Sequence, residues 1–232
     1  MQGRENELDK ESRFVLGCVG LDPLKTFLPI LDERLGSFAR LPFKLADVSK
    51  KLRELHANRF KPEFRNHVFE LSVLGFFAKE GVLTDIEVSV GAGQGTVDAE
   101  ISIDGRPILV EVTFTSQELL PPGPGSGAID VNQFVTQVVD KIRKKVAEGR
   151  QLALVRRNPS ILVLGRNRLG ADKVTSRWGV NECFDDPDFG KLSGVVVSDT
   201  WKLLRAEFHI APQPDVPLSG REIETLTRWF GI

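Results

Sequence analysis

The segment from Thr96 to Thr115 constrains the fold more than any other part of the sequence. Apolar and polar residues alternate on both sides of the dipeptide Asp104-Gly105. This alternation predicts two half-buried strands, and an Asp-Gly dipeptide between such strands favours a two-residue hairpin turn. The chain should therefore contain an antiparallel hairpin over these residues.

The register of this hairpin brings two acids together. A two-residue turn puts Ile103 opposite Arg106, and counting back puts Asp98 opposite Glu111. Facing side chains in neighbouring strands have Cβ atoms about 4.5–5.5 Å apart, and like charges there are destabilising. A divalent cation would remove that cost, since Mg²⁺ binds carboxylate oxygens. The hairpin is thus half of a predicted metal site, unless the acids lie on a solvated face or a bulge separates them.

Length and composition predict a globular protein. The chain has 232 residues, of which 41% are hydrophobic, enough for a sizeable core. No run approaches the roughly 18 apolar residues of a membrane span, and the first six residues contain no apolar signal core. We expect a soluble, cytoplasmic protein. Cys18 and Cys183 lie far apart, which gives no support for a zinc site or a disulfide framework.

Charge is unevenly distributed along the chain. The net charge is −1, which argues against a protein that coats nucleic acid without specificity. Residues 141–177, however, contain eleven basic and two acidic residues, a local net charge of +9. This basic stretch is a candidate phosphate-binding region. A solvated helix face followed by loops, with distant acids balancing the charge, is an equally open interpretation.

Residues 1–60 are interpreted as a helical N-terminal extension, and residues 61–232 as the main domain. Within the extension, apolar residues at helical spacing predict an amphipathic helix from about Leu45 to His56. Its basic residues are interpreted as a solvated face: Lys50, Lys51 and Arg53.

A second helix is predicted from Pro62 to about Glu80, with Gly81 as its end. Its broad apolar face should pack against a sheet. Glu70 lies within this apolar stretch, and a buried ionised carboxylate needs a partner. The partner is either a metal shared with the hairpin acids or a nearby basic side chain.

The remaining elements follow from shorter patterns. A weakly alternating strand precedes the hairpin, and a loop rich in proline and glycine follows it. A long helix capped by Asp130 comes next, and a helix capped by Ser219 ends the chain. The predicted strands outside the hairpin span residues 83–90, 160–164, 194–198 and 206–210, the loop spans 116–127, and the last helix spans 221–230.

The resulting αβββαβ order over Pro62 to Gly165 resembles the PD-(D/E)XK nuclease superfamily. In that family a helix Glu, an Asp on the second core strand and the Glu of an E-x-K on the third build a Mg²⁺ site. The matching residues here are Glu70, Asp98 and Glu111. The resemblance implies an α/β fold with a restriction-endonuclease-like core, in which helices flank a mixed sheet.

Two residues depart from the family pattern. Val97 precedes Asp98 where the family often has proline, and Thr113 stands where the family has its lysine. That lysine helps to position the attacking water and offsets charge on the phosphate. Lys141, four residues after Gln137 on the next helix, is the predicted replacement, with Lys144 next. A solvated basic face is the alternative.

The resemblance implies a metal-dependent nuclease that hydrolyses DNA phosphodiester bonds. Glu70, Asp98 and Glu111 would bind Mg²⁺ or Mn²⁺ and act in catalysis with Lys141. The expected partner is nucleic acid, with DNA favoured; a homodimer is left open, and no membrane is involved. The alternative is a catalytically degenerate nucleic-acid-binding or scaffolding protein on the same fold.

Overall fold

The structure, a computed structural model, describes residues 33, 36–38, 45–58, 64–90, 95–115, 131–146, 152, 157–166, 173–198, 203 and 206–231. Its helices are α3 (Leu45–Ala57), α4 (Phe64–Lys79), α5 (Val131–Val146), α6 (Lys173–Phe184), the short 3₁₀ helix η4 (Pro187–Phe189) and α7 (Gly220–Phe230). Its strands are β1 (Leu83–Val90), β2 (Gly95–Ile103), β3 (Arg106–Thr115), β4 (Ser160–Arg166), β5 (Gly194–Ser198) and β6 (Glu207–Ile210).

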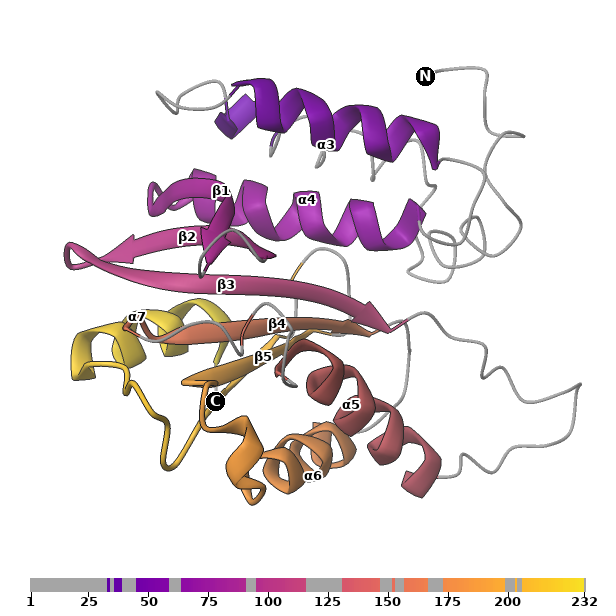
Figure 1. Cartoon of the computed structure of the whole chain (residues 1–232), viewed down its shortest axis with the longest axis vertical. Coiled ribbons are helices and arrows are strands. Elements are labelled where there is room, and N and C mark those ends of the chain that lie inside the picture. The colour runs from indigo at the N-terminus through magenta and orange to yellow at the C-terminus, as the bar shows by residue number, and fades with distance from the viewer. Residues whose placement is uncertain are drawn as a thin grey trace, which may run out of the picture.

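The strands form one six-stranded sheet in the order β1-β2-β3-β4-β5-β6 (Figure 1). The β1–β2, β2–β3 and β5–β6 pairs are antiparallel, whereas β3–β4 and β4–β5 are parallel. The parallel pairs require crossovers, which α5 and α6 supply. The prediction of an α/β protein with a mixed sheet flanked by helices is confirmed.

Local sequence signals explain the turn of the hairpin and the start of the last helix. Asp104 and Gly105 both adopt positive φ, at 57° and 80°, as a primed two-residue turn requires. The Ser219 side chain accepts a hydrogen bond from the Glu222 backbone N–H, and the Glu222 carboxylate accepts one from the Ser219 N–H. This capping box starts α7 at the predicted place.

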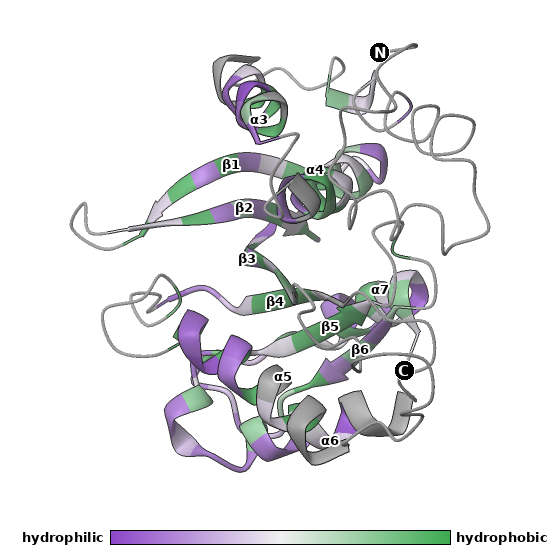
Figure 2. Ribbon diagram, turned by 90° about the vertical axis from the view of Figure 1, so that its right-hand side faces the viewer, coloured by the Kyte–Doolittle hydropathy of each residue, from purple (hydrophilic) through white to green (hydrophobic). Residues whose placement is uncertain are grey.

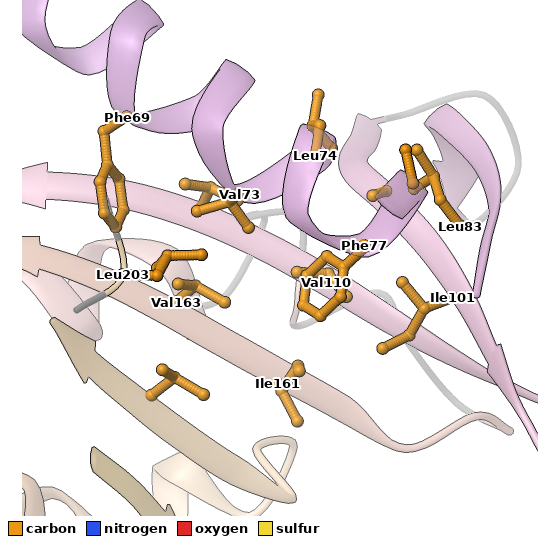
Figure 3. Packing of buried hydrophobic residues seen from close by; sticks show 14 of the residues in the cluster. Phe69, Val73, Leu74, Phe77, Leu83, Ile101, Val110, Ile161, Val163 and Leu203 are labelled. Atoms are coloured by element: carbon orange, nitrogen blue, oxygen red, sulfur yellow. The ribbon is translucent and has the colours of Figure 1, made fainter. Parts of the chain in front are cut away.

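The two faces of the sheet carry different helices. The core cluster on one face contains residues of α4 and α7, and the cluster on the other contains residues of α5 and α6 (Figure 2). On the first face, Phe69, Val73 and Phe77 of α4 pack over the sheet residues Val110 and Ile161 (Figure 3). The broad apolar face predicted for α4 is thereby buried against the sheet.

The helix α3 lies along the outer side of α4 (Figure 1). Leu55 is buried in the same core cluster as Phe69, and Val48 and Leu52 pack against that cluster. This part of the predicted N-terminal extension therefore contributes to the core. Among the helices described, none is both long enough and apolar enough to cross a membrane.

The helix α6 was not predicted. Its sequence mixes β-branched residues, Ser176 and Gly179 with few apolar residues, so its apolar stripe is weak even though Val180 and Cys183 are buried. The predicted positions of Pro62, Asp130 and the 116–127 loop lie outside the described residues.

Close packing at Gly165 generates a stability prediction. A Cβ added there would lie 2.5 Å from Cδ2 of Phe114 and 2.7 Å from ring carbons of Phe69. We expect Gly165→Ala to lower the free energy of unfolding by about 1–3 kcal/mol, the usual cost of overpacking. At Gly220 an added Cβ meets no heavy atom within 4 Å, so Gly220→Ala is the matched control. Urea unfolding of both variants measures the difference, and equal midpoints would contradict the packing described.

Candidate functional site

The hairpin register is as predicted. Ile103 pairs with Arg106, and the ladder between β2 and β3 continues to the pair Ala99–Val110. The backbone pairing ends at that pair, one residue short of Asp98 and Glu111. There the backbone ladder gives way to a side-chain bond, because Oδ2 of Asp98 accepts a hydrogen bond from the backbone N–H of Val112 at 2.7 Å.

Strands β1 and β2 each change the face of the sheet on which their apolar residues pack, and each does so at an acidic residue. Val97 packs in the core cluster of α5 and α6, yet Ala99, two residues later on β2, packs in the cluster of α4. Residues two apart normally share a face of a sheet. On β1 the same change separates Ile86 from Val88, across Glu87, whose φ is +52°. The sheet is locally twisted where Glu87 and Asp98 lie.

Glu111 is a buried carboxylate with one oxygen paired and one not. Its side chain is 1% exposed, and Oε1 lies 2.5 Å from Nζ of Lys145 on α5. Oε2 is buried and has no hydrogen-bond partner among the residues that the structure describes. Burial, together with the charge of Asp98, raises the pKa of Glu111 to about 7 in spite of the opposing charge of Lys145.

Asp98 lies at the centre of the electrostatic cluster. Burial raises the pKa of its carboxyl group above the ordinary value, whereas the Val112 N–H and then the charges of Lys51 and Lys145 oppose that shift. Both lysines therefore act on Asp98, although one belongs to α3 and the other to α5.

Glu70 joins the cluster from α4. Its Oε1 contacts Nζ of Lys51, and its Oε2 lies 4.0 Å from Nδ1 of His67. Burial and the charge of Asp98 raise the pKa of Glu70 to about 7, although Lys51 acts in the opposite direction. The helix acid predicted to face the hairpin acids thus interacts electrostatically with Asp98.

Lys51 and Glu87 also belong to this cluster, although the sequence did not predict them there. The Lys51 side chain is 7% exposed, so its interpretation as part of a solvated face is wrong. Nζ of Lys51 lies 2.6 Å from Oε1 of Glu87. The position of Lys51 in the helix was a usable signal, because it lies three residues after Val48 and four before Leu55 on the apolar face.

The lysines of α5 are arranged differently from the expectation. Lys141 was the predicted replacement for the family's lysine, but the amine that contacts Glu111 belongs to Lys145. Lys141, one turn earlier, is half-buried, and its burial, with Lys144 and Lys145 nearby, lowers its pKa. A catalytic role for Lys141 stays a prediction, and the side chain of Gln137 lies outside the described residues.

The basic stretch at 141–177 is described only in part. Four of its side chains are exposed: Arg143, Lys144, Arg157 and Arg177. Arg143 lies 3.6 Å from Asp140 and 3.9 Å from Asp186, which balances some of its charge. Lys144 is exposed on the same helix as Lys145.

The carboxylates do not form a ready-made metal centre. Within the described part of the chain, no three His, Cys, Asp or Glu side chains converge closely enough to bind one ion together. Lysine ammonium groups hold two of the acids instead, Lys51 at Glu70 and Lys145 at Glu111.

Cys183 takes no part in this cluster. It is a free, buried thiol on α6, and burial raises its pKa to about 12. A thiol in this state is a poor nucleophile and a poor metal ligand.

Comparisons with protein-family models, curated proteins and solved structures found no match for this chain.

The raised pKa values predict how stability depends on pH. A carboxyl group that is easier to protonate in the folded than in the unfolded state favours folding below its unfolded pKa, near 4.5, and loses that contribution as pH rises through about 7. The free energy of unfolding of the wild type, relative to that of Glu111→Gln, should therefore fall between these pH values.

Urea unfolding in EDTA across this pH range measures the effect. Glu100→Gln is the control, since Glu100 lies on the same hairpin, where it accepts a hydrogen bond from Thr84 outside the cluster. A wild-type advantage over Glu111→Gln that grows with pH would contradict the assignment.

Proposed function

We propose that this protein is a metal-dependent nuclease that hydrolyses phosphodiester bonds of DNA. The observation that carries the proposal is the cluster of Glu70, Asp98 and Glu111, contributed by a helix and two adjacent strands, in which Glu111 is buried and the other two are half-buried. Acids with strongly perturbed pKa values that share one buried region are candidates for a functional site. A purely structural core gains nothing from an Asp98 that interacts with both Glu70 and Glu111.

The chemistry of this cluster fits a hard divalent cation. Carboxylate oxygens are the donors that Mg²⁺ and Mn²⁺ prefer. The buried Oε2 of Glu111 is an acceptor that no described residue uses. Glu70, Asp98 and Glu111 would hold the cation, and the ion would supply Lewis acidity that activates water and offsets negative charge on a phosphate.

The neighbouring basic residues complete the proposed site. Lys145 places a positive charge against Glu111, and in a cleavage reaction the same charge would stabilise the phosphate as negative charge builds on it. Lys144 and Arg143 are exposed on the same helix and would attract the nucleic acid backbone. DNA is bound in this proposal through its phosphates, not through its bases.

The order of elements supports the same proposal at the level of the fold. The order α4-β1-β2-β3-α5-β4 contains the acids on α4, β2 and β3. We interpret this part of the structure as a restriction-endonuclease-like core, with Lys145 in place of the lysine that Thr113 replaces. Because a shared fold does not imply a shared function, the proposed function depends on the three acids and not on the fold.

Cleavage of supercoiled plasmid tests the proposed function. With Mg²⁺ or Mn²⁺ the wild type should cut the plasmid, and EDTA should stop the reaction. Glu111→Gln should lower the rate on the order of a hundredfold or more, because it removes a charge at the reacting phosphate's site. Glu100→Gln should retain the wild-type rate.

Two outcomes would reject the nuclease assignment. One is equal cleavage by the wild type and Glu111→Gln, which would point to a contaminating nuclease. The other is no cleavage by folded wild type with either cation, together with retained, salt-dependent DNA binding. That result would favour a catalytically inactive nucleic-acid-binding protein.

A second prediction separates the lysines of α5. Because Nζ of Lys145 lies 2.5 Å from Glu111, Lys145→Ala should cost on the order of a hundredfold in single-turnover cleavage. Lys144→Ala should mainly weaken DNA binding and its salt dependence. Lys141→Ala should have a smaller effect on the rate than Lys145→Ala. A larger loss of rate in Lys141→Ala than in Lys145→Ala would favour Lys141 as the catalytic lysine.

A further inference from the structure

Lys51 contributes a positive charge to the carboxylate cluster, although its helix lies outside the αβββαβ set of elements. It belongs to α3, and its buried Nζ bridges Glu70 on α4 and Glu87 on β1. Its charge also acts on Asp98. One ammonium group thus serves three acids contributed by three different elements.

Glu87, the second acid that contacts Lys51, has an unusual backbone conformation. Ile86 pairs with Ala99 and Val88 with Val97, which brings Glu87 level with Asp98 on the neighbouring strand. Glu87 is a non-glycine residue with a φ of +52° inside a strand, a conformation that costs energy unless the surroundings impose it. Its two carboxylate oxygens bind Lys50 at 2.7 Å and Lys51 at 2.6 Å.

The Lys51 ammonium occupies an oxygen that a divalent cation would also use. Glu70 Oε1 is in contact with Nζ of Lys51, and the other titratable groups near Glu70 include Asp98, Glu54 and His67. Lys51 is the amine in contact with Glu70 among the residues described. A divalent ion and an ammonium group cannot both contact this oxygen without strong repulsion in a buried site.

We propose that Lys51 and a divalent cation compete for Glu70, so that loading of the site releases Lys51 from Glu70 and loosens α3. This inference rests on the proposed metal site and extends it to α3 and Glu87. In the absence of the cation, Lys51 neutralises Glu70 and holds α3 against the cluster. When the cation is bound, Lys51 retains Glu87 as its partner.

Calorimetric titration with MnCl₂ alone tests the competition, with the chain at neutral pH and no nucleic acid present. Removing the competing charge in Lys51→Met should tighten Mn²⁺ binding by about fivefold to a hundredfold, the usual range of coupling between two sites. Lys50→Met is the matched control, because Lys50 also binds Glu87 but is exposed and does not contact Glu70. Its affinity should equal that of the wild type.

A second measurement uses the wild type and does not depend on a variant that folds. Reductive methylation followed by mass spectrometry reports how accessible each amine is. Mn²⁺ should accelerate methylation of Lys51 and leave that of Lys50 unchanged. Unchanged methylation of Lys51 at Mn²⁺ concentrations that saturate the wild type, or Mn²⁺ affinity in Lys51→Met equal to or weaker than wild type, would overturn the proposal.

The titration also separates this proposal from the proposed function. Mn²⁺ binding by the wild type that Glu111→Gln abolishes, without tightening in Lys51→Met, would reject the competition and leave the metal site intact. No Mn²⁺ binding by the wild type, Lys51→Met or Lys50→Met would reject both. Binding by Lys51→Met alone would support the competition.

Discussion

The burial of several carboxylates in one region is the constraint on which the rest of this structure depends. Asp98 and Glu111 lie on adjacent strands and interact electrostatically, and Glu70 interacts with Asp98 from α4. Removing a carboxylate from water is costly, and neighbouring like charges add to the cost. The protein offsets this cost with Lys51 and Lys145, whose amines contact two of the three acids.

The two lysines reach the cluster from different layers of the molecule. Lys51 comes from α3, which lies along the outer side of α4, and Lys145 comes from α5 on the opposite face of the sheet (Figure 2). This arrangement requires the acids to be accessible to both layers. The local twist of β1 and β2 at Glu87 and Asp98 makes the acids accessible from both faces of the sheet, because the residues before and after each acid pack in different core clusters. The irregular positions of β1 and β2 are therefore the same residues that contribute acids to the charge cluster.

The strands and the acids could be predicted from the sequence because their signals are local. Alternation and the Asp-Gly turn predicted the hairpin register correctly from Ile103–Arg106 to Ala99–Val110, and Asp98 and Glu111 are the next residues on the two strands. The lysines depend on tertiary packing. Lys51 was misinterpreted as solvated although it lies on the apolar side of its helix, and Lys145, not the favoured Lys141, contacts Glu111. Glu87 gave no signal, since strand periodicity does not reveal a residue with positive φ.

We propose that the carboxylate cluster is a cation site that lysines neutralise when no metal is present. A crystal soaked in MnCl₂ and measured at the manganese absorption edge tests this claim most directly. We predict an anomalous density peak bounded by carboxylate oxygens of Asp98 and Glu111. A well-ordered crystal with no such peak, in which Lys145 still contacts Glu111 and Lys51 still contacts Glu70, would contradict the account.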